Sequence, residues 1–375
     1  MERIIIRHTK FDSNPLGDGG SKRSAQIREI LMGAGIPFED EKFALSKFSL
    51  KDLVVYICRS FLFVQKTFTF KEIGSIKRYW SILKIVALRI PIIVDKYKNQ
   101  SILFLWESTV SNNFAYPFLM KENNVPIIAL PHNLESLVPT QKDGFSGKIS
   151  PDWFQNELKG LSLCKAVFTI SREECWLLKL YGINAFYLPY YPPKDVEKIL
   201  LEIREIRQQR VISNLTPKIL LLGSATNPPT YNGMLEMISL CKQEKPSVEL
   251  HVGGFQTERL KDEVGESPQI ILHGTLSDIE LNNLLMNVDA VLIHQQVSTG
   301  ALTRVPEMLI AGIPVLINAD AARSNYEHKG LFIYNTDEQL LKYLREYNWS
   351  IPPMFVKQSD YIREFIDQVK LLSTI

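Results

Sequence analysis

Residues 289–317, DAVLIHQQVSTGALTRVPEMLIAGIPVLI, carry the clearest indication of the fold. Its apolar runs at 290–293 and 314–317 are continuous rather than alternating, which is typical of strands in a parallel sheet covered on both faces. Between them, a loop containing Gly300 leads into a helical segment that has Pro306 in its first turn and ends at Gly312. Strand, loop, helix and strand in this order predict a βαβ unit.

The same alternation extends through both halves of the chain. Further short apolar runs predict strands at residues 4–6, 102–106, 127–130, 166–170, 219–222, 248–252 and 270–272. Capping-box patterns at 171–174, 277–280 and 336–339 predict helix starts, and Gly182 marks another helix end. We therefore predict an α/β protein built from two doubly wound, Rossmann-like domains.

Proline-rich residues 188–194 separate the two halves, because adjacent prolines favour an extended connection. We predict a first domain over 1–190, a linker helix over 191–211 and a second domain over 212–350. Residues 351–375 predict a C-terminal helix that could pack back on the first domain.

The composition is that of a globular protein, with 45% apolar residues, 22% charged residues and a net charge of +2. Such a near-neutral charge disfavours nucleic acid as a partner. Four cysteines without CxxC spacing are typical of reduced thiols in a cytosolic protein. No apolar run reaches the roughly 18–20 residues of a membrane span, so we expect a cytoplasmic protein.

Residues 41–100 fit the strand–helix rhythm poorly. Between Arg59 and Lys98 there are nine Lys and Arg against two acidic residues, a local charge of +7, and Phe, Tyr and Trp are interleaved with the bases. One interpretation is a pair of helices with a solvated basic face over an ordinary core. The other is a patch at 59–98 that docks on an anionic membrane surface, which would make the protein peripheral on the inner face of the membrane. The sequence favours neither.

The loop at 294–304 carries the strongest functional pattern. Gly300 allows backbone to approach a ligand closely, and Arg304 at the start of the helix offers a fixed positive charge to a diphosphate. Glu307 could accept hydrogen bonds from ribose hydroxyls. The plainer interpretation is a strand–helix turn with a surface Arg and a solvated Glu.

The order of the motifs resembles family 4 of the retaining GT-B glycosyltransferases. PHNLES at 131–136 resembles the family's His-bearing loop, and VFTISREE at 167–174 with the YGI and LP that follow resembles the end of its first domain. KILLLGS at 218–224, GTLSD at 274–278, DAVLI at 289–293 and the segment 306–315 resemble blocks of its nucleotide domain. The resemblance implies a first domain on the acceptor side and a second that binds the nucleotide sugar, with the cleft between them.

The resemblance implies roles for the second domain. Glu307 matches the second Glu of the family's E-x7-E motif, which implies ribose binding, whereas the first Glu falls at Thr299. Further positions that the resemblance assigns to the donor are Gly300, Ala301, Thr303, Gly223 and Ser224. The loop after Gly223 lacks the Arg and Lys that usually meet the diphosphate, so Arg304 and Arg23 are the candidate replacements.

In the first domain, His132 matches the family's His beside the reacting carbon of the donor sugar, and we predict His132 and Arg304 as the catalytic residues. A plain alternative is that His132 caps the next turn. Gly19 and Gly20 match the Gly-rich turn near the phosphate. Since this turn is not GxGxxG, an NAD site is disfavoured.

Together these observations predict a metal-independent glycosyltransferase that has no cofactor and uses a UDP- or GDP-linked sugar as substrate. The acceptor would be a glycan or a lipid-linked precursor in cell-surface polysaccharide or glycoconjugate synthesis. The departures at Thr299 and after Gly223 support an alternative, a non-catalytic scaffold subunit. A sugar-nucleotide epimerase of the same fold would need acid and base carboxylates, and the motifs offer no convincing set.

Overall fold

A computed structural model describes residues 3–41, 50–67, 79–80, 82–83, 86, 101–107, 109, 114–139, 142–143, 148–210 and 216–374. The chain divides into two compact units. Unit 1 comprises Met1–Ser13, Ile27–Pro189 and Gln358–Ile375, and unit 2 comprises Asn14–Gln26 and Tyr190–Lys357. Residues 14–26, which the sequence analysis assigns to the first domain, therefore group with unit 2.

Unit 1 is built on a parallel six-stranded sheet in the order β2-β1-β3-β4-β5-β6. Its strands are β1 (Ile4–His8), β2 (Phe38–Asp40), β3 (Ile102–Trp106), β4 (Ile127–Ala129), β5 (Ala166–Thr169) and β6 (Ala185–Tyr187). Its helices are α1 (Gly19–Gly33), α2 (Leu50–Thr67), α5 (Tyr116–Glu122), η3 (Glu135–Leu137), α6 (Trp153–Leu161), α7 (Arg172–Leu180) and α15 (Ser359–Ser373). The boundary between the units falls inside α1.

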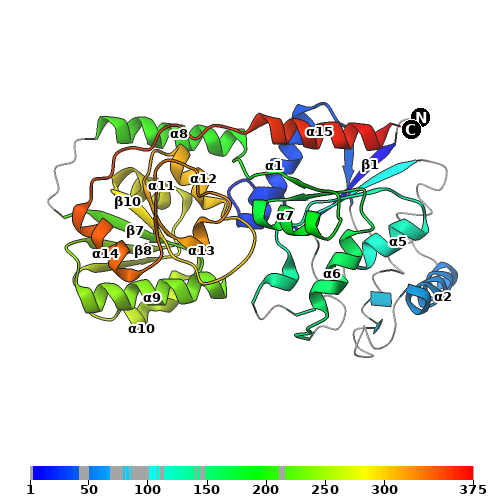
Figure 1. The fold of residues 1–375 in the computed structure, drawn as a ribbon, viewed down its shortest axis with the longest axis horizontal. Helices are drawn as coiled ribbons and strands as arrows, with labels where there is room; N and C mark the ends of the chain where they lie inside the picture. The colour runs from blue at the N-terminus through cyan, green and yellow to red at the C-terminus, as the bar shows by residue number, and fades with distance from the viewer. Residues whose placement is uncertain are drawn as a thin grey trace. The chain divides into compact units, whose positions relative to one another are not determined.

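Both faces of the first sheet are covered, as continuous apolar strands require. On one face α2, α5, α6 and α7 pack around buried aromatic residues that include Trp106 and Phe114. On the other face α1 and α15 contribute to one buried cluster, to which α15 adds Phe365 and Val369. The two ends of the chain meet, since the Arg3 N–H donates to the Ser373 carbonyl oxygen at 2.9 Å (Figure 1).

Unit 2 has a second parallel six-stranded sheet, in the order β12-β11-β10-β7-β8-β9. Its strands are β7 (Lys218–Leu222), β8 (Glu249–Gly253), β9 (Ile270–Gly274), β10 (Ala290–Ile293), β11 (Val315–Asn318) and β12 (Leu331–Tyr334). Its helices are α8 (Lys194–Gln209), α9 (Pro228–Glu244), η4 (Thr257–Leu260), α10 (Lys261–Val264), α11 (Asp278–Asn287), α12 (Arg304–Ile310), α13 (Ala319–Ala322) and α14 (Asp337–Glu346). α9, α10 and α14 cover one face, and α8, α11 and α12 the other.

The predicted fold class is confirmed, since both sheets are parallel and flanked by helices. The nine predicted strands are all present, and β2, β6 and β12 are additional. Ser277 and Glu280 form the complete capping box predicted at 277–280. The patterns at 171 and 336 supply only the N-cap side of the box, from Ser171 and Thr336. Gly182 and Gly312 have φ of 73° and 71°, the left-handed conformation expected where helices end.

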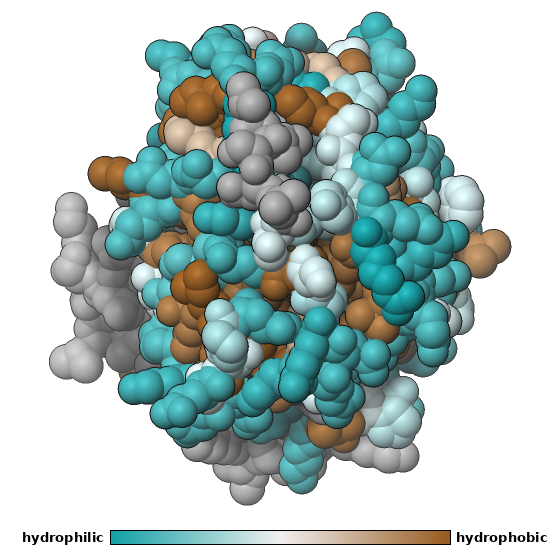
Figure 2. Space-filling model, turned by 90° about the vertical axis from the view of Figure 1, so that its left-hand side faces the viewer, coloured by the Kyte–Doolittle hydropathy of each residue, from teal (hydrophilic) through white to brown (hydrophobic). Residues whose placement is uncertain are grey.

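Most of the predicted membrane patch lies outside the described residues, apart from part of α2 and a few positions up to 86. Within the described parts of the chain, no helix is both long and apolar enough to cross a bilayer. The face of the molecule in Figure 2 is mostly hydrophilic where residues are described, with apolar residues in small groups.

Candidate functional site

The order of strands in unit 2 locates a natural ligand site. Strands β8 and β9 lie on one side of β7, and β10, β11 and β12 lie on the other, so the direction of winding changes between β7 and β10. Ligands of open α/β sheets bind outside the carboxyl ends of the strands at such a switch point. The loop that starts at Gly223 and the loop at 294–304 leave from these two strand ends.

Two side chains that the sequence analysis missed hold the 294–304 loop. The Asn318 side chain accepts from the Gln295 N–H at 3.1 Å and donates to the Gln295 carbonyl oxygen at 2.8 Å. Arg323 donates to the Gly300 carbonyl oxygen at 2.8 Å, to that of Thr299 at 3.0 Å and to the Gln295 side chain at 3.0 Å. With Gly300 at a φ of 73°, these bonds fix the shape of the loop.

Arg304 begins α12 and donates to the Leu222 carbonyl oxygen at the end of β7. A Cβ at Gly223 would lie 3.4 Å from the Arg304 guanidinium and only 2.5 Å from Thr230, so glycine is needed for this approach. Burial lowers the pKa of Arg304 to about 10, so the guanidinium remains protonated at neutral pH. The structure thus places a fixed cation at the switch point.

Glu307 is buried on α12, and both of its carboxylate oxygens are engaged. Lys22 on α1 donates to Oε1 at 2.9 Å and to Oε2 at 2.7 Å, and the Tyr190 hydroxyl donates to Oε1 at 2.8 Å. Burial and the adjacent Glu307 charge raise the pKa of Tyr190, so this phenol keeps its proton. Glu307 is therefore not the solvated carboxylate of the plainer interpretation.

The Gly-rich turn before α1 adjoins the same group. Asp18 accepts from the Ser21 N–H at 2.8 Å and caps α1, and a Cβ at Gly19 would lie 3.6 Å from the Thr303 hydroxyl. Arg23, one of the candidate replacements for the missing basic residues, is buried and donates to the Gln26 side chain at 2.6 Å. Lys22, rather than Arg23, is the α1 cation paired with Glu307.

The loop after Gly223 has no charged residue before α9, and its backbone packs closely against the β8 loop. Ser224 is partly buried, with its hydroxyl 2.8 Å from that of Thr226. Gly254 has a φ of 128°, and a Cβ there would meet the Gly223 carbonyl oxygen at 2.0 Å. Glycine at position 254 therefore allows the β8 loop to pack closely on the backbone of Gly223. The remaining predicted positions, Thr299 and Ala301, lie partly buried on the 294–304 loop.

His132 belongs to unit 1, where it follows β4. The His132 ring stacks on the Phe11 ring, with centroids 4.6 Å apart. The Lys10 ammonium lies over the Phe11 ring, 5.0 Å from its centroid. Phe11 lies on the loop after β1, the strand at the switch point of the first sheet. His132 therefore lies on the carboxyl edge of the sheet, beside the β1 loop.

Two buried glutamates hold the His132 loop. Glu174 accepts from the Leu134 N–H at 3.0 Å, and Glu157 accepts from the N–H groups of Glu135 and Ser136 at 2.9 and 3.0 Å. Burial raises the pKa of Glu157 to about 8. Neither carboxylate was predicted as a loop anchor from the sequence, although both occur in helices that follow the loop.

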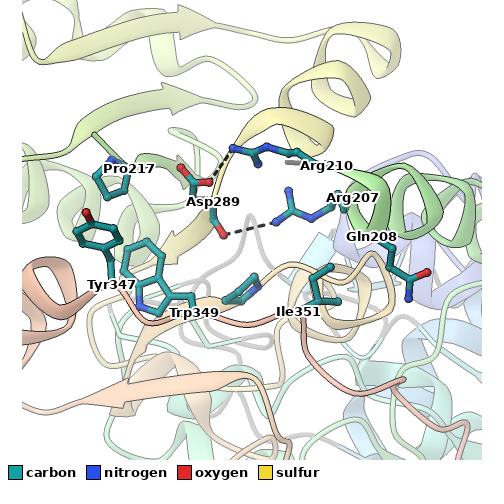
Figure 3. Close-up of a pocket in the computed structure, with 9 residues that line it drawn as sticks. Arg207, Gln208, Arg210, Pro217, Asp289, Tyr347, Trp349 and Ile351 are labelled. Carbon is teal, nitrogen blue, oxygen red and sulfur yellow. Dashed lines mark hydrogen bonds and ion pairs between the residues drawn. The ribbon is translucent and has the colours of Figure 1, made fainter. Parts of the chain in front are cut away.

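A cavity of about 200 Å³ lies at the opposite, amino edge of the second sheet, before β7, β10 and β11. Figure 3 shows Arg207 and Arg210 pointing toward Asp289, with Tyr347 and Trp349 forming an apolar wall. The Arg207 guanidinium donates to the carbonyl oxygens of Leu285 and Val288 at 2.7 and 2.6 Å, and it also donates to that of Gly312. Because these cations already bind backbone, we assign them to tying α8 to the sheet.

The amino-acid sequence matches no protein-family profile and no curated protein. The structure is similar to sucrose-phosphate synthase from Thermosynechococcus elongatus, with a TM-score of 0.59 and 12% identity over 98% of this chain and 95% of that one. The UDP-forming α,α-trehalose-phosphate synthase of Burkholderia xenovorans gives a TM-score of 0.61 at 10% identity, covering 100% of both chains. HepE of Anabaena, solved with UDP and glucose, gives 0.54 at 13%, covering 99% of this chain and 95% of that one. This chain has the GT-B fold.

At these identities the likeness establishes architecture, in agreement with the fold that the motif order predicts. Within unit 2 the structure brings together Gly19, Thr303, Gly223, Arg304 and Glu307. Lys22 was also missed from the sequence, although it lies only two residues after Gly20, the end of the Gly-rich turn.

Proposed function

We propose that this protein is a retaining glycosyltransferase of the family 4 type. It would move a sugar from a UDP- or GDP-linked donor to a glycan or lipid-linked acceptor in cell-surface polysaccharide or glycoconjugate synthesis. The observation that carries the proposal is the arrangement around Glu307 and Arg304 at the switch point of the second sheet. A buried carboxylate able to accept from ribose hydroxyls and the partly buried guanidinium of Arg304 lie within one helical turn there.

Glycosyl transfer from a nucleotide sugar needs a positive charge beside the leaving diphosphate. Breaking the bond between sugar and phosphate leaves a nucleoside diphosphate with additional negative charge, which donors already in place must stabilise. Arg304 supplies a charge that persists at neutral pH, since its pKa is about 10. Gly300 and the Gly223 loop allow backbone to come close to the diphosphate. In transfer through same-face attack, an oxygen of the leaving diphosphate can take the proton of the acceptor hydroxyl, so no dedicated carboxylate base is needed.

The similar structures support a nucleotide sugar as donor. The HepE structure is described in complex with UDP and glucose, and a trehalose-phosphate synthase of similar structure is described as UDP-forming. The proposed reaction takes its nucleotide sugar as substrate and uses no metal or other cofactor. Activity should therefore be the same after treatment with EDTA as with added Mg²⁺ or Mn²⁺.

The non-catalytic scaffold is the second candidate, favoured by Thr299 in place of the motif's first Glu and by the uncharged loop after Gly223. Both proposals allow nucleotide binding, and only the enzyme releases nucleotide from a nucleotide sugar. A screen of UDP- and GDP-sugars for thermal stabilisation and for release of UDP or GDP separates them. Ligand at about 100 times its Kd should add about 2.7 kcal/mol of apparent stability.

Calorimetry on Glu307→Ala tests the site itself. Loss of hydrogen bonds from ribose to a charged group should weaken UDP or GDP binding by about 1–3 kcal/mol. Glu338→Ala, at an exposed position on α14, is the matched control and should bind as the wild type does. Equal affinity in the folded Glu307 variant would remove this residue from the site.

A further inference from the structure

Lys22 and the ribose of a bound donor would compete for the same carboxylate, that of Glu307. The Glu307 carboxylate that the proposed function assigns to ribose already accepts two bonds from Lys22, at 2.7 and 2.9 Å. The Glu307 side chain is 6% exposed, while that of Lys22 is 21% exposed, so the ammonium lies at the open side of the pair. A ribose that reaches Glu307 must take over bonds that Lys22 now makes.

The diphosphate of the donor needs positive charge, which the loop after β7 does not supply. The loop after β7, from Gly223 to the start of α9, contains no Lys or Arg. Arg304 supplies one cation, but a diphosphate carries more than one negative charge. Lys22 is one helical turn into α1, whose first residue Gly19 adjoins Thr303, the residue directly before Arg304. A lysine can redirect its charge because four flexible carbons carry the ammonium.

We infer that Lys22 is an exchangeable counter-ion that binds the donor diphosphate. In the protein without donor, Lys22 neutralises Glu307; when ribose hydroxyls bind Glu307, the ammonium turns to the phosphate oxygens. Lys22 thereby replaces the cation that the β7 loop lacks. This inference rests on the proposed function, since it requires a nucleoside diphosphate at this site.

Tyr190 makes the exchange feasible. Its hydroxyl donates to Glu307 Oε1 at 2.8 Å, and its raised pKa, caused by burial and by the Glu307 charge, keeps the proton on the phenol. The carboxylate therefore keeps one donor while Lys22 moves away, and ribose hydroxyls supply the others. A buried carboxylate stripped of all its donors would be strongly disfavoured.

The test compares a nucleoside with its diphosphate, because only the diphosphate should need Lys22. Calorimetry measures the Kd of uridine and UDP, and of guanosine and GDP, for the wild type, Lys22→Gln and Lys22→Arg. Lys22→Gln keeps a donor beside Glu307 but removes the charge. It should bind the nucleoside as well as the wild type or better, while the nucleoside-to-diphosphate ratio of Kd values falls about tenfold or more. Lys22→Arg should keep the ratio within about threefold of the wild type.

Lys329→Gln, at an exposed lysine of unit 2, is the control and should leave the ratio unchanged. If Lys22→Gln does not fold, the single variant Glu307→Gln is compared with the double variant Lys22→Met/Glu307→Gln. The double variant removes both charges of the ion pair, so it leaves no buried charge unpaired. The nucleoside-to-diphosphate ratio of Kd values should fall in the double variant and not in the single one. An unchanged ratio, or equal losses for nucleoside and diphosphate, would overturn the role of Lys22 and leave the proposed function standing. A wild type that binds neither UDP nor GDP would overturn both.

Discussion

Arg323 donates from Nε to the Gly300 carbonyl oxygen at 2.8 Å, and from Nη2 to the carbonyl of the preceding Thr299 at 3.0 Å. One side chain therefore holds the loop at the residue whose φ of 73° gives the loop its bend. Since Arg323 follows α13, the loop after β10 depends on the segment after β11. This is a common way to preorganise a ligand loop without touching the ligand.

We expect Arg323→Ala to loosen this loop. Loss of hydrogen bonds from a charged donor should lower the free energy of unfolding by about 1–3 kcal/mol. Binding of UDP or GDP should weaken as well, because the loop must then be ordered by the ligand. Urea unfolding and calorimetry measure the two effects. Arg345→Ala, on the exposed side of α14, should change neither the free energy of unfolding nor the affinity for nucleotide. Wild-type values of both in Arg323→Ala would contradict the proposed anchoring role.

The fold could be predicted because its signals are local. Continuous apolar runs, glycine at helix ends and the Ser277 capping box each act within a few residues, and the structure has them where the sequence predicts them. The edge strands β2, β6 and β12 were missed, and they differ from the predicted central strands in that fewer of their residues are buried. Their pairing is decided by the neighbouring strand rather than by their own pattern.

The candidate site was only partly predictable, because some of its contacts join residues far apart in the sequence. Arg304 and Glu307 stand close together in one helix, so their spacing indicates a common site. Lys22 is 285 residues from Glu307, and no local pattern links them. Glu157 likewise anchors a loop 21 or 22 residues away. Such pairs follow from tertiary packing, which short-range patterns do not encode.

The catalytic assignment makes a kinetic prediction. Arg304→Ala should reduce kcat by about 10²–10³, as removal of one donor to a developing negative charge does. His132→Ala should also slow transfer if His132 acts at the reacting sugar. Arg304→Lys should recover part of the rate, since it keeps the charge but not the planar donor fork. Wild-type transfer rates in both alanine variants would remove His132 and Arg304 from the catalytic assignment, whereas the scaffold alternative predicts no transfer by the wild type either.

The loop that carries His132 should respond to pH through Glu157. Burial raises the pKa of this carboxyl to about 8 from its usual 4.5. Between these values the folded chain holds a proton that the unfolded chain has released. The free energy of unfolding should therefore fall as pH rises through this window, by at most about 1.4 kcal/mol per pH unit. Urea unfolding at pH 5.5, 7 and 8.5 should show this slope in the wild type and a flatter one in Glu157→Gln. Glu205→Gln, exposed on α8, should keep the wild-type slope, and an equally steep Glu157→Gln would refute the assignment.

The last prediction concerns α2, whose residues 59–67 belong to the predicted membrane patch at 59–98 and whose earlier residues extend the same helix face. Val54, Phe61 and Leu62 are 60%, 43% and 67% exposed, and with Ile57 they follow helical spacing along one side. Arg59 is exposed on the same helix, within the segment of charge +7. An apolar helix face with basic residues is what an anionic lipid surface attracts, and each Lys or Arg near the surface contributes about 1 kcal/mol. We therefore propose that this segment docks the protein peripherally on an anionic membrane.

Co-sedimentation should show binding to vesicles containing phosphatidylserine, weak binding to phosphatidylcholine alone, and partial release by salt, because salt screens the charges but leaves the apolar contact. Cys58 is the exposed cysteine on α2, while Cys164, Cys175 and Cys241 are buried, so a polarity-sensitive dye on Cys58 reports insertion directly. Val54→Ser/Leu62→Ser should abolish the salt-resistant part and the dye signal. Ile279→Ser, equally exposed but on α11 of unit 2, is the control and should retain both. Equal, negligible binding to the two kinds of vesicle at low salt would refute membrane docking by α2 and favour a soluble acceptor.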